Sequence, residues 1–376
     1  MKIGLFALET GRNVGGLEIY ETNLIRALAR IDQTNQYSIF CLDPIVPQKL
    51  QINAPNFQFH VLRANRFKGV AWDAPCAMRR EKIDLFHAIF VPPPFTRIPY
   101  AFTMHGSEVL ARPDFYPLPL RWRIQFLFRR AIKHARLILC VSNYVRDYLE
   151  KQHRVPAKRL ATIYPGCDFA PVPTELARSK VEREFNLRAR YILSVGRIEP
   201  RKNPIAVLRA YDAFRRSTAN PPKLCFAGMK TWSAKDFDRT VRELSLAPFI
   251  VELSHVPHES LPALYSAAEF TVFASLWEGF GLPAVEAMAC GSPLITSNNT
   301  SLPEITAGAA LLVDALSIES ISAAMLSLHE NASLRIELKH KGMKQAGKFT
   351  WDETARQCLR GYELTNLISQ PPQSAR

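Results

Sequence analysis

Apolar residues follow two alternating patterns along the chain. Short continuous apolar runs, beginning with Lys2–Leu8, are typical of strands that are buried on both faces of a parallel sheet. Between them lie loops and stretches with apolar residues at helical spacing, as in Leu17–Ile31. Repetition of this unit predicts a parallel sheet covered by helices on both faces. The strand-like runs of the first half are KIGLFAL, YSIFCL, FQFHVL, IDLFHAIF, YAFTM and RLILCVS.

The same pattern starts again after a linker. The segment YPGCDFAPVPTE, Tyr164–Glu175, is rich in proline and glycine, and YILSV at Tyr191–Val195 opens a second series of strands. We therefore predict two doubly wound α/β domains, residues 1–170 and 171–350. Two such domains are expected to face each other, with a ligand bound in the crevice between the carboxyl ends of their strands. The tail, 369–376, is expected to be disordered.

Composition narrows the class of protein. The 376 residues are 47% hydrophobic and 22% charged, which suits two domains that each have a core. Seven scattered cysteines without a CxxC pair favour reduced thiols in the cytoplasm and argue against a zinc site. The apolar run before Glu9 is too short for a signal peptide, and no stretch is long enough to span a membrane.

Positive charge is concentrated in the first half of the chain. The formal net charge is +14, and residues up to Phe169 contain 24 basic and 13 acidic side chains, against 24 and 21 afterwards. This asymmetry predicts an anionic partner for the first domain. The stretch between Asp114 and Asp147 has no acidic residue and seven basic ones.

A helix over Leu120–Arg136 would divide this stretch into two faces. One face mixes aromatic and cationic groups, as a surface that meets anionic lipid headgroups does. The alternative is an ordinary solvated helix whose aromatic residues contact a neighbouring loop. The residues predicted to pack on the sheet are Ile124, Leu127, Phe128, Ala131 and Ala135, and the candidate membrane-docking residues are Trp122, Phe126, Arg129, Arg130 and Lys133.

The segment SLWEGFGLPAVEAMACG places two glutamates around a glycine loop. A strand, Glu269–Ala274, precedes the loop, and Pro283 is expected at the first position of a helix that ends near Cys290. The amides at such a helix start attract phosphate. Glu286 is placed to accept hydrogen bonds from ribose hydroxyls, and Glu278 from the hydroxyls of a sugar. The alternative is a capped helix with two solvated acids. The amides in question belong to Phe280, Gly281 and Leu282.

A second motif, SVGRIEPRKN, follows the first strand of the second domain. Arg197 and Lys202 are expected at the carboxyl edge of the sheet, on either side of a turn that contains Pro200. Two cations in that position suit a diphosphate and would neutralise it as it leaves the sugar. By itself, the motif also fits a basic surface turn.

With both motifs in place, the chain resembles the retaining, nucleotide-sugar-dependent glycosyltransferases of family four. These enzymes have two Rossmann-like domains in the arrangement called GT-B. The resemblance covers nearly the whole length, and the spacing of the two glutamates, with seven residues between them, is specific in this setting. Other segments that carry the resemblance are VGGLEIY, TMHG, VSNYVRDYL, YPGCD, VGRIEPRKN, AGMKTW, LPALYSAAEF, SPLITSNNTSLPEI and FTWDETA.

The resemblance assigns roles to individual residues. Gly15 and Gly16 match the first-domain loop that acceptor and diphosphate approach, and His105 matches the histidine beside the reacting sugar. Arg197 and Lys202 match the diphosphate clamp. Glu278 and Glu286 match the contacts to the sugar and to the ribose, and His255, Val256 and Pro257 fall where the base-binding loop lies. The chain departs from the family pattern at Ser254, usually glycine, and at Gly106, often aspartate.

The resemblance also implies a mechanism, and the basic helix of the first domain suggests a place in the cell. Retaining members react on one face of the sugar through an oxocarbenium-like state, in which the leaving diphosphate itself can deprotonate the acceptor. His105 is therefore expected to contact the donor sugar, not to act as a base, and no metal or other cofactor is expected. The last helix, 351–368, resembles the family segment that crosses back to the first domain. A cytoplasmic enzyme that docks on the inner face of the plasma membrane would fit a lipid-linked acceptor.

Three functions compete at this point. A glycosyltransferase moves a hexose to a glycan or lipid-linked hydroxyl, and the motifs look most like members that transfer mannose from GDP-mannose in bacterial surface polysaccharide synthesis. A nucleotide-sugar epimerase of the same architecture would turn over its donor without an acceptor. A non-catalytic basic protein would bind membrane or nucleic acid, with strong salt dependence. The motifs favour the first, and no RNA-reading aromatic motif supports nucleic-acid binding.

Overall fold

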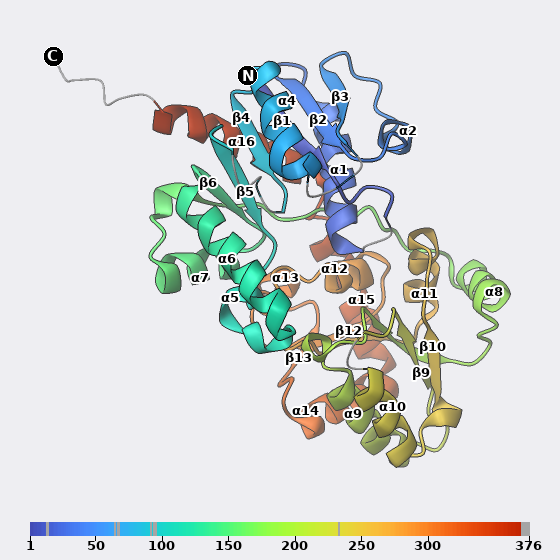
Figure 1. Ribbon diagram of the computed structural model, residues 1–376. Helices are drawn as coiled ribbons and strands as arrows, with labels where there is room; N and C mark the ends of the chain where they lie inside the picture. The colour runs from blue at the N-terminus through green and yellow to red at the C-terminus, as the bar shows by residue number, and fades with distance from the viewer. Residues whose placement is uncertain are drawn as a thin grey trace. The chain divides into compact units, whose positions relative to one another are not determined.

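The computed structural model describes residues 1–12, 15–63, 65, 68–90, 92, 96–231 and 234–369 (Figure 1). The chain forms two compact units: unit 1 contains Met1–Gly166 and Thr350–Arg376, and unit 2 contains Cys167–Phe349. The first change of unit lies within the predicted linker, slightly before the predicted boundary at residue 170.

Unit 1 is built on a parallel sheet of seven strands in the order β3-β2-β1-β4-β5-β6-β7. Every residue of β5 is buried, as expected for a strand covered on both faces. The strands are β1 (Lys2–Ala7), β2 (Gln36–Cys41), β3 (Phe57–Val61), β4 (Leu85–Ala88), β5 (Tyr100–Met104), β6 (Leu137–Cys140) and β7 (Leu160–Thr162).

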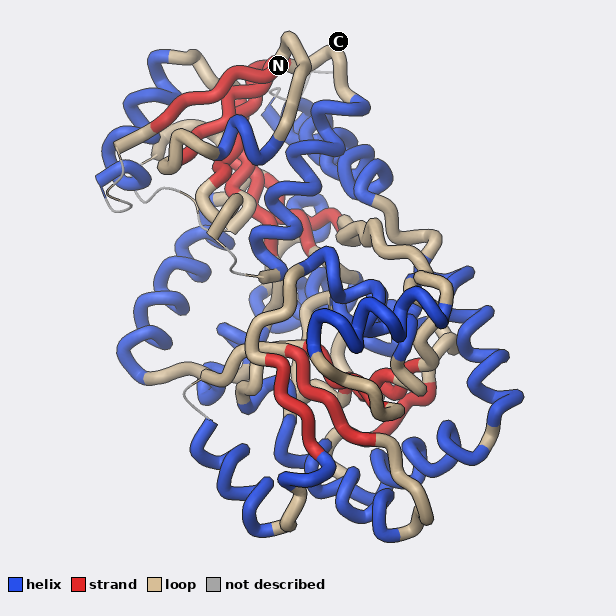
Figure 2. Tube along the Cα trace, turned by 90° about the vertical axis from the view of Figure 1, so that its right-hand side faces the viewer, coloured by secondary structure: helices blue, strands red, loops and turns tan. Residues whose placement is uncertain are grey.

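Helices connect and cover these strands (Figure 2). The helices of unit 1 are α1 (Gly16–Ile31), α2 (Val46–Leu50), α4 (Ala74–Arg80, preceded by a π-turn at Gly69–Asp73), α5 (Glu108–Ala111), α6 (Leu118–His134), α7 (Asn143–His153) and α16 (Trp351–Ser369). Short 3₁₀ turns occur at Pro113–Phe115 and Ala157–Arg159.

The C-terminal helix α16 belongs to the core of unit 1. Ala355, Cys358 and Tyr362 are fully buried among residues of α1 and of the sheet. The Tyr362 hydroxyl lies 2.7 Å from His87 Nδ1, and His87 Nε2 lies 2.6 Å from Thr103 Oγ1. This buried polar chain joins α16 to β4 and β5. Ser369 is the last residue of the helix, and the rest of the predicted tail, 370–376, lies outside the described residues.

Unit 2 contains a six-stranded parallel sheet in the order β10-β9-β8-β11-β12-β13. Its strands are β8 (Tyr191–Val195), β9 (Lys223–Ala227), β10 (Ile250–Leu253), β11 (Thr271–Phe273), β12 (Leu294–Ser297) and β13 (Leu311–Val313). Its helices are α8 (Thr174–Phe185), α9 (Pro204–Arg216), α10 (Ala234–Glu243), α11 (Leu261–Ala267), α12 (Leu282–Ala289), α13 (Leu302–Thr306), α14 (Ile318–Glu330) and α15 (Ala332–Ala346). The 3₁₀ turns are η4 (Pro200–Lys202), Ala247–Phe249 and His258–Ser260.

The prediction of two doubly wound α/β domains is confirmed. In both sheets the chain adds strands outward from β1 or β8 on one side and then on the other, which is the Rossmann order. The core of unit 2 comes from the apolar faces of the sheet and of helices such as α9 and α14. In the described part of the chain, no helix is both long enough and apolar enough to cross a membrane.

Candidate active site

The predicted donor-site residues of the second domain lie at one edge of the sheet in unit 2, whereas Gly15 and Gly16 belong to unit 1. β8 and β11 are neighbours in the sheet although they are far apart in the chain, so the strand order reverses between them. Loops that leave such strands diverge, and open parallel sheets bind their ligands at this reversal point. Arg197 and Lys202 follow β8, whereas Glu278 and the start of α12 follow β11. The two motifs therefore flank the same reversal point.

The loop after β8 is fixed by the loop after β9. The Ile198 amide donates to the Met229 carbonyl at 3.0 Å. A Cβ atom on Gly228 would lie 2.1 Å from the Gly196 carbonyl oxygen, so this close approach requires glycine. Arg197 is exposed in this loop, whereas the Lys202 side chain is 15% exposed.

Glu278 lies at the centre of a buried ion-pair cluster. Lys202 Nζ donates to Glu278 Oε1 at 2.6 Å, and Arg201 Nη1 donates to Glu278 Oε2 at 3.0 Å. Arg201 also pairs with Glu199 at 2.9 Å. The residue predicted to bind sugar hydroxyls thus contacts the residue predicted to bind diphosphate, a pairing that the sequence did not predict. Arg201 is a further member of the site that the sequence did not single out.

Burial and ion pairing act in opposite directions on the pKa values of this cluster. Burial alone would raise the pKa of Glu278, but Lys202 and Arg201 outweigh it and hold that pKa below its usual value. Burial lowers the pKa of Lys202, and the charge of Glu278 opposes this effect. Lys202 Nζ also lies 4.6 Å from the centre of the Phe273 ring, a cation–π distance. An arriving anion would share Lys202 with Glu278 without having to order the lysine side chain first.

The start of α12 presents backbone amides beside this cluster. Gly281 caps the helix with φ 100°, and a Cβ there would lie 2.7 Å from Leu302 Cδ2, so glycine is required. No hydrogen bond from the Gly281 or Leu282 amide is found within the described residues. The Ser301 hydroxyl lies within bonding distance of the Glu278 and Phe280 carbonyls, at 3.2 and 3.0 Å. This buried serine, which the sequence did not single out, fixes the loop that leads to an anion-binding helix start.

Glu286 lies on the inner side of α12 and is 6% exposed. The Tyr265 hydroxyl donates to Glu286 Oε2 at 2.8 Å, and Oε1 has no partner among the residues that the structure describes. Burial raises the pKa of Glu286 to about 7, against the opposing effects of the Tyr265 hydrogen bond and of the Lys202 charge. One carboxylate oxygen is thus held in place and the other remains an acceptor. Tyr265, which the sequence did not single out, is the residue that orients it.

The predicted base-binding loop follows β10 at the same edge of the sheet. His255 is exposed and Val256 is half-buried. Phe280, whose amide was predicted to bind the donor, buries its ring against Phe349, with the ring centres 5.5 Å apart. Its side chain therefore anchors the loop, and only its backbone is placed for a ligand.

His105 follows β5 in unit 1 and has a defined tautomer. Its Nε2 lies 2.7 Å from the Ile89 carbonyl oxygen, so Nε2 carries the proton and donates it to that carbonyl. Burial lowers the pKa of His105 to about 4, and the Tyr20 ring packs edge-on at 4.6 Å. The imidazole is therefore neutral at neutral pH, and Nδ1 is a hydrogen-bond acceptor. This is the chemistry of a group that contacts a hydroxyl, not that of a proton donor.

Two carboxylates of α1 fix the loop between β1 and α1. Glu21 accepts hydrogen bonds from the amides of Leu8, Glu9 and Thr10 at 2.8–3.0 Å. Glu18 accepts one from the Gly11 amide at 2.6 Å. This support for the loop was missed because a buried glutamate on a helix has no sequence signature that distinguishes it from a solvated one.

The predicted glycines lie next to this loop. Gly15 caps α1 with φ 84°, and Gly16 is the first residue of the helix; both are exposed. Because neither glycine has a side chain, a ligand can approach the backbone closely at the start of this helix.

Comparisons with known proteins decide the family. The family model described as "Glycosyl transferases group 1" matches residues 177–345, and the model described as "Glycosyltransferase Family 4" matches residues 14–170. The chain belongs to the family-four glycosyltransferases. The predicted family and the prediction of an enzyme that transfers a glycosyl group are thereby confirmed.

Named relatives support this assignment. The enzyme is 32% identical over 264 residues to "O-antigen chain mannosyltransferase B" of Escherichia coli, which covers 70% of this chain and 69% of that protein. It is 29% identical over 208 residues to "Serotype-specific mannosyltransferase WbdA" of E. coli, covering 54% of this chain but only 26% of that much longer protein. The structure of Anabaena Alr3699/HepE in complex with UDP-glucose matches with a TM-score of 0.76 and 16% identity, over 96% of this chain and 99% of that one. That likeness shows the shared fold.

Proposed function

We propose that the enzyme is a retaining mannosyltransferase that uses GDP-mannose and extends a glycan or lipid-linked acceptor in bacterial surface polysaccharide synthesis. The observation that carries the proposal is the arrangement at the reversal point of unit 2, where Lys202, Glu278 and the start of α12 lie together. Mannose is chosen because relatives such as the O-antigen chain mannosyltransferase of E. coli bear that name. The acceptor class is proposed from the same relative.

Each group in the site has a proposed task. The donor diphosphate binds Arg197, Lys202 and the amides of Gly281 and Leu282, and Glu286 Oε1 accepts hydrogen bonds from ribose hydroxyls. Glu278 accepts hydrogen bonds from hydroxyls of the transferred sugar. The loop that contains His255 and Val256 lies against the base.

The reaction exchanges one bond to the anomeric carbon for another. The bond from the anomeric carbon to the diphosphate oxygen breaks, and negative charge develops on that oxygen beside Lys202 and Arg197. The acceptor oxygen bonds to the same face of the sugar, and its proton passes to the leaving diphosphate. The neutral His105 contacts a sugar hydroxyl through Nδ1 and takes no proton, and Gly15 and Gly16 leave room for the reactants.

The direct test is transfer by the purified protein with GDP-mannose, UDP-glucose, UDP-GlcNAc and UDP-galactose, each with and without a polysaccharide acceptor. We expect consumption of GDP-mannose that depends on the acceptor, and an α-linked product by NMR. Turnover without any acceptor that yields an isomeric nucleotide sugar would contradict transfer and support an epimerase. Preference for a UDP donor would overturn only the proposed donor, GDP-mannose, and not the proposal of glycosyl transfer.

We further propose that no metal ion is needed, because Arg197, Lys202 and the helix start already supply positive potential to the diphosphate. Within the described ranges, no group of three or more His, Cys, Asp or Glu side chains is arranged to hold a metal ion. We expect initial rates in EDTA to equal those in magnesium or manganese. Loss of activity in EDTA with recovery on adding magnesium would contradict this prediction.

The proposed acceptor also indicates where the enzyme works. Lipid-linked glycans are presented at the surface of a membrane, so we place the enzyme in the cytoplasm, in reversible contact with the inner face of the plasma membrane. Nucleic acid is not a proposed partner.

A further inference from the structure

The outer face of α6 carries a row of large apolar side chains in contact with solvent. Leu118, Trp122 and Phe126 are 65%, 72% and 67% exposed. They are spaced four residues apart, so they lie on one side of the helix over about 12 Å. A row of this kind on a surface helix marks an interaction site, because scattered exposed residues would not align.

The opposite face of α6 is anchored in unit 1. Phe128 packs edge-on against Phe90 and Phe102, with ring centres 5.7 Å apart in both cases, and Ala131 and Ile132 are buried. The predicted division of this helix into two faces is therefore confirmed, although the helix begins two residues earlier than predicted and ends at His134. Because one face is fixed by the core, the apolar row cannot rotate inward.

Basic side chains continue the row towards the end of the helix. Arg129, Arg130 and Lys133 are all exposed. No acidic residue occurs between Asp114 and Asp147, and Asp114 is itself paired with Arg112 at 2.7 Å. A hollow of about 440 Å³ on this face is lined by the aromatic and the basic residues together: Trp122, Gln125, Phe126, Arg129, Arg130, Lys133 and His134.

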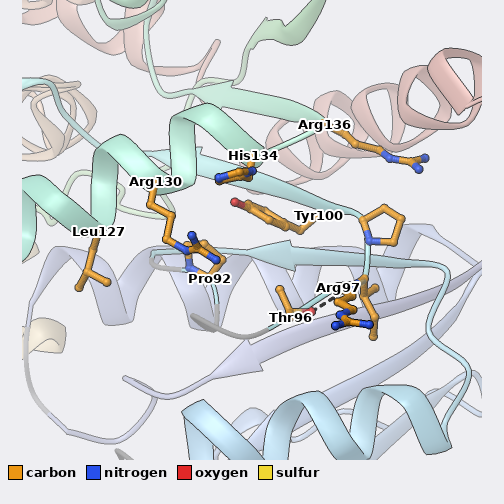
Figure 3. A pocket seen from close by; sticks show the side chains of 10 residues that line it. Pro92, Thr96, Arg97, Tyr100, Leu127, Arg130, His134 and Arg136 are labelled. Atoms are coloured by element: carbon orange, nitrogen blue, oxygen red, sulfur yellow. Dashed lines mark hydrogen bonds between the residues drawn. The ribbon is translucent and has the colours of Figure 1, made fainter.

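A second hollow, of about 290 Å³, adjoins the basic end of the helix (Figure 3). Arg130, His134 and Tyr100 all line this hollow, and none of its ten lining residues is acidic. Its other basic members are Arg97 and Arg136. Tyr100 is the first residue of β5, and His105 follows the last residue of this strand. The hollow therefore lies at the amino ends of the strands, whereas His105 lies at their carboxyl ends.

We propose that the outer face of α6, defined by Leu118, Trp122, Phe126, Arg129, Arg130 and Lys133, docks on a bilayer that contains anionic phospholipid. The helix lies in the plane of the interface, with its apolar row among the headgroups and its basic end on lipid phosphates. The hollow between Arg130 and His134 receives one of these phosphates. This docking surface rests on the proposed function in one respect only: a lipid-linked acceptor is the reason for the enzyme to bind a membrane. A partner attracted by charge alone would not account for the apolar row.

The experiment measures binding of the full-length protein to vesicles of phosphatidylcholine with and without phosphatidylglycerol, by sedimentation and by tryptophan fluorescence. We expect binding only when phosphatidylglycerol is present, and weaker binding at high salt. Arg129→Gln with Lys133→Gln should weaken binding about 30-fold. Trp122→Ala with Phe126→Ala should weaken it at least about tenfold, because the apolar contact is lost. Trp122→Phe should keep most of the binding but lose the blue shift of the fluorescence.

The matched control removes two charges from another exposed helix of unit 1, by Arg79→Gln with Arg80→Gln on α4, and should bind as the wild type does. Equal loss in this control, or equal binding to neutral vesicles, would overturn the docking surface. Binding to inorganic phosphate or to RNA without binding to vesicles would also overturn it. Transfer to a soluble acceptor is assayed in parallel. Vesicle binding without transfer would contradict the proposed function alone, and transfer without vesicle binding would contradict the surface alone.

Discussion

Replacing Lys202 with alanine is expected to lower kcat/KM for the donor by about 10³-fold, or about 4 kcal/mol of transition-state stabilisation. Lys202 Nζ is held 2.6 Å from Glu278, at the point where the loops after β8 and β11 diverge. Its charge is therefore in place before the diphosphate begins to leave, and no side-chain ordering is needed during the reaction. Steady-state rates with varied donor concentration measure the effect.

The fold should survive this substitution, because Arg201 still pairs with Glu278 at 3.0 Å and the buried carboxylate keeps a partner. Thermal unfolding followed by circular dichroism checks this. Lys341→Ala is the matched control, since Lys341 is also ion-paired in unit 2 but is 55% exposed and lies on α15. Wild-type kinetics in Lys202→Ala, or an equal loss in the control, would remove Lys202 from the mechanism.

Much of the fold could be predicted because its signals are local. Buried parallel strands appear as continuous apolar runs, and glycine or proline at the loops marks where they end. The bounds of α6 were less accurate. Pro117 is the N-cap residue and Pro119 lies in the first turn, where proline is favoured, so α6 starts at Leu118 and not at the predicted Leu120.

The charged residues of the candidate site were predicted from the sequence, but the contacts between them were not. Arg197, Lys202 and Glu278 stand in recognisable loops and Glu286 in the helix that follows, yet nothing in the order of residues shows that Lys202 and Glu278 pair. Such a contact depends on two strands, β8 and β11, that become neighbours only when the sheet forms.

Supporting residues are harder still to predict. Tyr265 and Ser301 have no chemistry that distinguishes them from other buried tyrosines and serines until the fold places them against Glu286 and the α12 loop. Arg201 adjoins Lys202, and only the geometry shows that both reach Glu278.

Replacing Glu286 with glutamine is expected to raise the donor KM by about 10²-fold and to remove its pH dependence. The ionised carboxylate can accept two hydroxyl hydrogen bonds, whereas glutamine has a single acceptor oxygen. Burial raises the pKa of Glu286 to about 7, so in the wild type the ionised form is lost as pH falls below that value. If the donor binds only that form, its KM rises about tenfold for each pH unit below 7. Donor titrations between pH 5.5 and 8.5 measure this in both proteins.

Glu286→Gln should weaken donor binding but increase the stability of the folded protein at pH 8. A loss of activity in this variant would therefore not be caused by a damaged fold. A carboxyl whose pKa is higher in the folded state binds its proton more tightly there, so its contribution to stability falls as pH rises from about 4.5 to about 7. Glutamine is never charged, and its oxygen can still accept from Tyr265. Glu286→Gln should therefore be more stable than the wild type at pH 8, by up to about 3 kcal/mol in the free energy of unfolding. At pH 4 this advantage should vanish. A variant that is less stable than the wild type at pH 8 would contradict the raised pKa of Glu286. A variant that keeps the pH dependence of the donor KM would show that Glu286 does not bind the donor as an ionised acceptor.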